Sequence, residues 1–184
     1  ASKILLKDDG YLVVEVHYLL NLLNLNQYDF FYHEHVNYYS IYSLKYLFEM
    51  HNFEIKKIKQ TNMHGGSLRV YLQKKKKTIK NKNLYLNKLI KNEKKLILTF
   101  FKKFKKNIYF QKKEVVKILK NIKNQNKKII GFGASGRGTT FLNFCKIDKK
   151  FLNVILDSSP LRAGKFMPGV KIPIKDISYL KKNS

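Results

Sequence analysis

The chain has 184 residues, of which 44% are hydrophobic, so it has enough apolar material for a folded core and is not an intrinsically disordered sequence. Its net charge of +26 comes almost entirely from lysine, and arginine, the usual reader of bases, occurs only at Arg69, Arg137 and Arg162. We therefore expect a lysine-covered surface and no specific nucleic-acid site. The single cysteine, Cys145, excludes an internal disulfide, and with no membrane span or signal peptide in the sequence we expect a cytoplasmic protein without a membrane partner.

The sequence pattern of residues 1–78 predicts short strands around one helix. Residues 11–16 are apolar at consecutive positions, which is typical of a strand buried on both faces of a parallel sheet. Ser40 is a suitable N-cap for a helix that ends at His51 and Asn52. Residues 53–59 and 67–73 alternate apolar and polar side chains and predict two further strands.

Residues 79–127 are rich in lysine and asparagine, and their apolar side chains recur at intervals of three and four residues. This pattern predicts one or two amphipathic helices that connect two domains. Residues 128–184 then read strand, glycine loop, helix and strand, as at the start of a βαβ unit. The predicted class is α/β, with a partial Rossmann-like domain at the end.

A glycine-rich loop follows the first strand of this last part, as Gly131-Phe132-Gly133-Ala134-Ser135-Gly136. Its spacing allows a tight turn and a close approach of backbone to a phosphate at a helix N-terminus. In this interpretation Arg137 and Thr139 contact the phosphate, and Asp157 after the next strand meets a ribose or sugar hydroxyl. The alternative is a purely structural turn.

Ionisable and phenolic side chains gather at Tyr32-His33-Glu34-His35. Two imidazoles and a carboxylate are common metal ligands, but their spacing is not His-Glu-x-x-His and no third ligand follows at a diagnostic spacing, so we predict no metal here. In an extended segment the two histidines would point one way, and Tyr32 and Glu34 the other. A general base with a supporting acid and phenol fits the cluster, since histidine titrates near neutral pH, while a loop-capping histidine is the structural alternative.

In this order, the motifs resemble the S-adenosylmethionine-dependent C-methyltransferases that act on nucleotide-linked keto-deoxysugars. The resemblance runs over residues 3–174 and rests on residues 12–16, 32–35, 64–70, 133–137 and 157–160. In that family a zinc-binding N-terminal domain precedes a class I methyltransferase domain, and a C-terminal Rossmann-like domain helps to hold the sugar nucleotide.

The resemblance implies three parts for this chain: residues 1–78 as the end of the methyltransferase sheet, residues 79–127 as a helical connector, and residues 128–184 as a partial nucleotide-sugar-binding domain. Residues 11–16 would be the fifth strand of the methyltransferase sheet, followed by its last two, antiparallel strands. We expect a fragment, inactive alone, whose S-adenosylmethionine loop and zinc cysteines lie upstream of Ala1.

The implied reaction removes a proton from the carbon next to the sugar ketone, after which the enolate attacks the sulfonium methyl group. The resemblance makes His35 the candidate base, with Glu34 and Tyr32 orienting it or stabilising the enolate. The candidate substrate-binding residues are Arg69, Gly133, Ser135, Arg137, Thr139 and Asp157. The family commonly has lysine at the position of Arg137 and asparagine at that of Thr139. A non-catalytic nucleotide- or NAD-binding module that uses the loop from Gly131 to Gly136 is the alternative function.

Overall fold

A computed structural model describes residues 2–76 and 83–183 and shows a mixed α/β fold. The chain divides into two compact units. Unit 1 comprises Ala1–Gln27 and Val36–Phe104, and unit 2 comprises Tyr28–His35 and Lys105–Ser184. The short segment Tyr28–His35 therefore belongs to the later unit, although the chain on both sides of it belongs to the earlier one.

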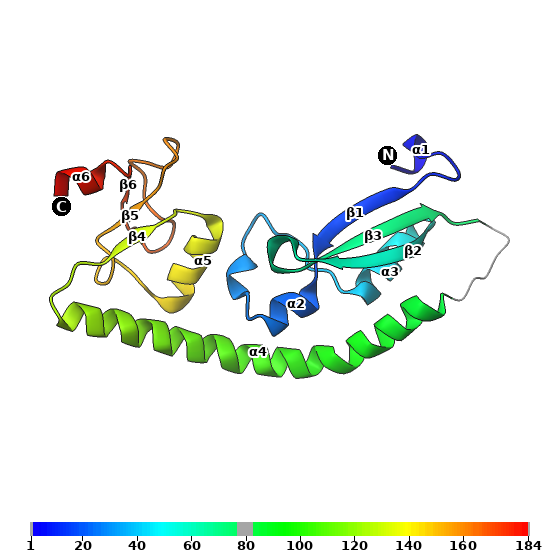
Figure 1. Cartoon of the computed structure of the whole chain (residues 1–184), viewed down its shortest axis with the longest axis horizontal. Coiled ribbons are helices and arrows are strands. Elements are labelled where there is room, and N and C mark those ends of the chain that lie inside the picture. The colour runs from blue at the N-terminus through cyan, green and yellow to red at the C-terminus, as the bar shows by residue number, and fades with distance from the viewer. Residues whose placement is uncertain (1, 77–82, 184) are drawn as a thin grey trace. The chain divides into compact units, whose positions relative to one another are not determined.

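Unit 1 is built on a three-stranded sheet. Its elements are α1 (Ser2–Leu5), β1 (Leu12–His17), α2 (Leu19–Asn24), α3 (Ile41–Met50), β2 (Phe53–Thr61), the 3₁₀ turn Met63–Gly65 and β3 (Ser67–Lys74). The strand order is β1-β3-β2, and β3 is antiparallel to both neighbours (Figure 1). Consequently β1 and β2 run in the same direction, with the last strand reversed between them.

The core of unit 1 lies on one face of the sheet. In the central strand, Leu68, Val70 and Leu72 are completely buried. The predicted helix is confirmed: the Ser40 hydroxyl accepts from the Ser43 N–H, the Ser43 side chain accepts from the Ser40 N–H, and the helix ends at His51. These reciprocal bonds fix where α3 begins.

The expectation that residues 11–16 are buried on both faces of a parallel sheet is wrong. Accessibility alternates along β1, and Val13 is 48% exposed. The partner strand described for β1 is antiparallel β3, and an antiparallel sheet commonly covers only one face. A consecutive apolar run does not by itself distinguish the two arrangements.

The connector is one helix, α4 (Leu84–Asn124, 41 residues), and its sequence contains neither proline nor glycine. Leu86, Leu89 and Ile97 of its first half pack with the core of unit 1. Val115 and Leu119 of its second half pack with the core of unit 2. The amphipathic repeat therefore serves two separate hydrophobic clusters.

Unit 2 contains a parallel sheet. It comprises the 3₁₀ turn Tyr28–Phe30, the second half of α4, β4 (Ile130–Phe132), α5 (Gly136–Cys145), β5 (Val154–Leu156), β6 (Ile174–Lys175) and α6 (Tyr179–Asn183). The order β4-β5-β6, with both pairs parallel, confirms the predicted βαβ pattern. All three residues of the central strand β5 are buried.

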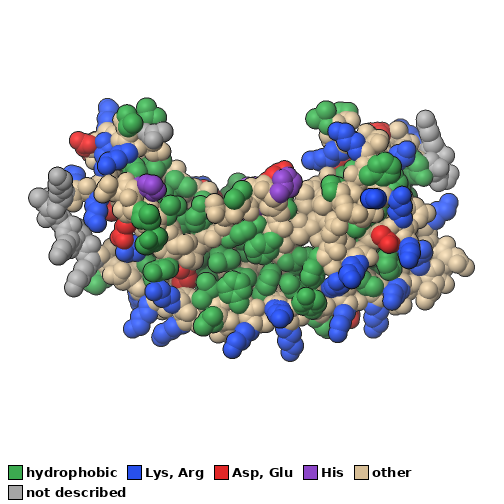
Figure 2. Space-filling model, turned by 180° about the vertical axis from the view of Figure 1, so that it is seen from behind, with side chains coloured by type: hydrophobic (Ala, Val, Ile, Leu, Met, Phe, Trp, Pro, Cys, Tyr) green, Lys and Arg blue, Asp and Glu red, His purple; other side chains and the backbone are tan. Residues whose placement is uncertain are grey.

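Figure 2 shows lysine and arginine side chains along the lower edge of the drawn face and toward both of its ends, with hydrophobic side chains between them. Of the helices that the structure describes, none combines the length and apolar character needed to cross a bilayer.

Candidate functional site

The segment Tyr28–His35 packs against the first turns of α5. The Asp29 carboxylate accepts from Arg137 Nε at 2.7 Å and lies 2.5 Å from Arg137 Nη2. The Arg137 guanidinium also lies 4.1 Å from the centre of the buried Phe30 ring. The Thr140 hydroxyl donates to the Phe31 carbonyl at 3.4 Å. These contacts bring together two motifs that are about a hundred residues apart in the chain.

Tyr32 and His35 form a hydrogen-bonded pair. His35 Nδ1 lies 2.9 Å from the Phe30 carbonyl oxygen, and His35 Nε2 lies 3.2 Å from the Tyr32 hydroxyl. A carbonyl only accepts, so the Nδ1 contact assigns the proton of neutral His35 to Nδ1. The lone pair then lies on Nε2, where the Tyr32 hydroxyl donates to it. The half-buried imidazole is thus held in the tautomer that a base at Nε2 requires.

Residues 32–35 form a turn and not an extended segment, so the alternation of side chains that an extended segment would give does not apply. The His35 N–H donates to the Tyr32 carbonyl at 2.9 Å, which closes a turn and brings the rings of Tyr32 and His35 to a centroid distance of 4.3 Å. Glu34 and His33 are both exposed, and Glu34 Oε1 lies 4.0 Å from His33 Nε2. Among the described contacts it is therefore Tyr32, not Glu34, that reaches the His35 ring.

The glycine loop has one open side and one closed side. Gly133 adopts a φ of +89°, which favours glycine, and a Cβ built there would meet no atom of the described residues within 4 Å. At Gly136 a Cβ would lie 2.8 Å from the Tyr32 ring, so the lack of a side chain allows Tyr32 to pack on the first turn of α5. The loop is accordingly open at Gly133 and covered by the predicted catalytic segment at Gly136.

Ser135 and Thr139, two of the predicted substrate-binding residues, stabilise the start of α5. The Ser135 hydroxyl accepts from the Gly138 N–H at 3.1 Å as the N-cap, and the Thr139 hydroxyl donates to the Ser135 carbonyl at 3.1 Å. Both hydroxyls are therefore already engaged in local hydrogen bonds, and their role toward a ligand stays a prediction.

Asp157 follows β5 directly, and its carboxylate stabilises the glycine loop. Only 5% exposed, its carboxylate accepts from the N–H groups of Ser159 at 2.8 Å and Ala134 at 2.7 Å, and from Arg162 Nη1 at 3.2 Å. These donors, Ser159 first and then Ala134, hold the pKa of the Asp157 carboxyl below its ordinary value, against the effect of burial. These contacts show that Asp157 supports the glycine loop. Contact of Asp157 with a sugar hydroxyl stays a prediction.

Arg69 belongs to unit 1, whereas the other candidate residues belong to unit 2. Arg69 Nε donates to the Glu15 carboxylate at 2.7 Å, and Glu15 also accepts from the Thr61 hydroxyl at 2.6 Å. Glu15 raises the pKa of Arg69, and the Thr61 hydroxyl, followed by Arg69, lowers the pKa of Glu15. This cluster bridges all three strands of the unit 1 sheet.

Sequence reasoning missed Asp29, Phe30 and Arg162. Asp29 lies among aromatic residues with no motif around it, and its partner Arg137 is 108 positions away. Arg162 was noted only as one of the three arginines of the chain. A local pattern therefore carries no signal for the Asp29–Arg137 pair.

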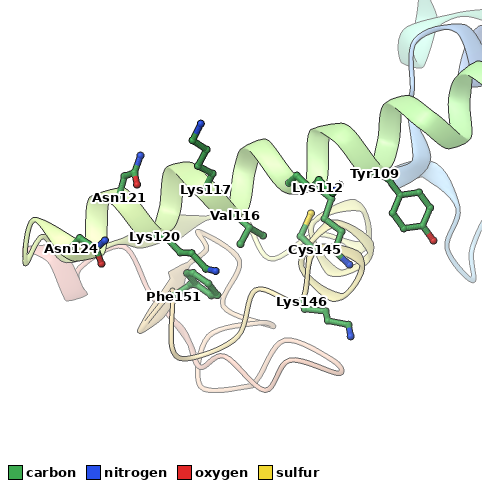
Figure 3. Close-up of a pocket in the computed structure, with 11 residues that line it drawn as sticks. Tyr109, Lys112, Val116, Lys117, Lys120, Asn121, Asn124, Cys145, Lys146 and Phe151 are labelled. Carbon is green, nitrogen blue, oxygen red and sulfur yellow. The ribbon is translucent and has the colours of Figure 1, made fainter.

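A groove of about 770 Å³ lies at the other end of α5 (Figure 3). Its lining includes Lys112, Val116 and Lys120 of α4, together with Cys145 and Phe151. The Cys145 Sγ lies 3.5 Å from the Tyr28 hydroxyl, and burial raises the pKa of the thiol. Such a thiol is a poor nucleophile. No group of three or more potential metal ligands was found within the described ranges 2–76 and 83–183.

Known proteins resemble this chain over most of its length. The sequence model of the C-methyltransferase C-terminal domain family matches residues 62–184. The C-methyltransferase NovU of Streptomyces niveus is 28% identical over 172 residues, which cover 92% of this chain and 41% of NovU. The chain thus spans less than half the length of that curated relative. Since the family model matches well over half of the chain, the chain belongs to the C-methyltransferase C-terminal domain family.

Proposed function

We propose that this chain is part of an S-adenosylmethionine-dependent C-methyltransferase that methylates the carbon next to the ketone of a nucleotide-linked deoxysugar. Membership of the family and the similarity to NovU support methyl transfer to carbon. The observation that carries the chemistry is the Tyr32–His35 pair. Tyr32 packs on Gly136 of the glycine loop, and its hydroxyl contacts the basic nitrogen of His35, Nε2.

The Tyr32–His35 pair fits the first chemical step. A carbon next to a ketone loses a proton when a base is positioned on it and a donor stabilises the oxyanion that forms. In the proposed step, the C–H bond breaks, its proton goes to His35 Nε2, and its electron pair forms the enolate with the charge on oxygen. The Phe30 carbonyl then stabilises the imidazolium through Nδ1.

The Tyr32 hydroxyl has two possible acceptors during this step. In the structure it donates to His35 Nε2 at 3.2 Å, so the same nitrogen accepts a substrate proton only after the phenolic hydrogen turns away. A hydroxyl hydrogen rotates freely, and the enolate oxygen is the acceptor that appears in the same step. We therefore assign Tyr32 to the oxyanion, and leave exposed Glu34 as an auxiliary group.

When bound, S-adenosylmethionine supplies an electrophilic methyl group. The adjacent glycines of unit 1 offer no open loop for it: a Cβ at Gly65 would overlap the Gln27 side chain, and one at Gly66 would overlap that of Asn21. No described residue is assigned to S-adenosylmethionine, and the residues discussed here act on the sugar.

The nucleotide end of the substrate is proposed to lie at the glycine loop. Gly133 leaves its backbone open, and α5 presents its N-terminal end and positive dipole there. An anionic diphosphate suits such a place, which supports a nucleotide sugar over a free sugar. The single, buried Cys145 also supports a reducing, cytoplasmic setting.

Deuterium exchange tests the proposed base separately from methyl transfer. The complete encoded protein is incubated in D₂O with a nucleotide-linked keto-deoxysugar and no methyl donor, and label at the carbon next to the ketone is followed by mass spectrometry. We expect His35→Ala to lower the exchange rate by about 10²–10⁴-fold and Tyr32→Phe by about tenfold or more. His51→Ala changes an exposed histidine at the end of α3 and is the matched control. Exchange at the normal rate in His35→Ala would exclude His35 as the base.

A nucleotide- or NAD-binding module without methyl chemistry is the second candidate, because the strand, loop and helix around Gly133 suit either ligand. Calorimetric titration of the complete protein separates the two. Binding of NAD with no binding of a nucleotide sugar would favour the module.

A further inference from the structure

The Asp29–Arg137 ion pair adjoins Phe30, the residue whose carbonyl contacts the candidate base His35. Both Arg137 contacts to the carboxylate end on the same oxygen, Asp29 Oδ2, at 2.5 and 2.7 Å. The Asp29 side chain is 23% exposed and that of Arg137 is 49% exposed. Because a partly buried carboxylate already occupies the Nε side of the guanidinium, a phosphate on that side would have to replace Asp29.

The pair is connected to His35 through one residue. Asp29 precedes Phe30 in the chain, and Phe30 contacts both Arg137 and His35. Its buried ring lies under the Arg137 guanidinium and stacks on the His35 ring at 5.8 Å with an interplanar angle of 17°, and its carbonyl contacts His35 Nδ1 at 2.9 Å. Arg137 therefore holds the residue whose carbonyl selects the tautomer of His35.

We propose that Asp29 and Arg137 are positioning residues that keep His35 in its Nδ1–H tautomer by fixing Phe30 against α5. The inference rests on the proposed function for its catalytic consequence, but the tautomer itself is a property of the protein without substrate. It gives Arg137 a role different from the phosphate contact expected from the sequence. The lysine that the family commonly has at this position keeps the charge, but it lacks the planar group that covers the Phe30 ring.

Nitrogen NMR of the complete protein, labelled with ¹⁵N-histidine, tests the tautomer. The signal of His35 is assigned by its loss in His35→Gln, and the shifts of its two ring nitrogens show which one carries the proton. We expect the Nδ1–H form in the unchanged protein and a mixture of both forms in Arg137→Ala and in Asp29→Asn.

Arg69→Ala is the matched control, because Arg69 is also a partly exposed arginine paired with one carboxylate, in unit 1. It should leave the His35 tautomer unchanged. Unaltered amide signals from β5 confirm that each variant is folded. The proposal is overturned if Arg137→Ala and Asp29→Asn both retain the Nδ1–H form, or if Arg69→Ala perturbs it equally.

The kinetics of the same variants separate positioning from phosphate binding. A positioning role predicts that Arg137→Ala and Asp29→Asn both lower kcat for the exchange reaction by about tenfold, with the KM for the nucleotide sugar within about twofold. A phosphate ligand predicts instead that Arg137→Ala raises KM and that Asp29→Asn does not, and this result would overturn the proposal. If exchange does not depend on His35 at all, the proposed function fails while the tautomer result stands.

Discussion

At the scale of single residues, the buried Asp157 side chain of unit 2 accepts hydrogen bonds from three donors. Its two oxygens join the glycine loop, through the Ala134 N–H, to the turn that begins at Ser159. We expect Asp157→Asn to destabilise unit 2 by about 1–3 kcal/mol, because an amide has one acceptor oxygen and leaves a buried donor unpaired. Thermal unfolding of the complete protein measures this effect. Asp148→Asn, which changes a residue with one acceptor contact in a nearby loop, should have little effect.

The difference in stability between the unchanged protein and Asp157→Asn should depend on pH in a defined direction. The pKa of Asp157 in the folded protein lies below its ordinary value of 3.8, so its carboxylate contributes full stability above that value. The contribution is lost as the pH falls through the lower, folded-state pKa. The stability difference between the unchanged protein and Asp157→Asn should therefore narrow below about pH 4. A difference that stays constant down to acid unfolding would mean that the Asp157 charge is not involved.

At the same scale, Cys145 should resist alkylation. It is 2% exposed, and burial raises its pKa, so little reactive thiolate forms at neutral pH. We expect iodoacetamide to modify it at least about tenfold more slowly than in urea-unfolded protein, as followed by intact-protein mass spectrometry. Rapid labelling of the folded protein would show that this end of α5 opens readily.

At the scale of elements, α4 contributes an acid that caps another helix. Glu93, 3% exposed, accepts from the N–H groups of Ile41 at 2.7 Å and Tyr42 at 3.0 Å, at the start of α3. Its carboxylate completes the N-cap that Ser40 begins, and its charge is favourable at a helix N-terminus. Two elements separated by about fifty residues are therefore joined by one side chain.

We expect Glu93→Gln to weaken α3 by about 1–3 kcal/mol, since one of the two N–H groups, buried at Ile41 and partly buried at Tyr42, loses its acceptor. Amide hydrogen exchange at Ile41 and Tyr42 is the direct measurement, and both amides should exchange faster. Glu114→Gln on the exposed face of the same helix is the control. Equal exchange rates in the two variants would argue against a capping role for Glu93.

The elements also show what the sequence could and could not predict. The helix after Ser40 and the strand, loop and helix around Gly133 depend on caps, turns and apolar spacing within a few residues, and both were found. Tyr32 and His35 face each other because of a turn over residues 32–35. That segment contains no glycine or proline from which the turn could be predicted. The packing of Tyr32 on Gly136 depends on a contact across about a hundred residues. Local patterns carry no information of that kind, so the site was predicted as residues and not as an arrangement.

At the scale of the whole molecule, two hydrophobic clusters share no residue. One is centred on Leu68, Val70 and Leu72, and the other includes Ile147, Ile155 and Ile172. We expect Leu68→Ala and Ile172→Ala each to cost about 2–5 kcal/mol, confined to the unit that carries the change. Hydrogen exchange with mass spectrometry resolves the units. Equal acceleration in both units from either substitution would show that they unfold together.

The membership of Tyr28–His35 in unit 2 has a consequence for protein engineering and for the evolution of relatives. The polypeptide passes from unit 1 to unit 2 after Gln27, returns after His35 and passes again after Phe104. A chimera joined within α4, the place that the linear order suggests, would combine residues 28–35 of one parent with the α5 helix of the other. Recombination that preserves the site must therefore exchange both pieces at once, or keep Asp29 and Arg137 matched between the parents.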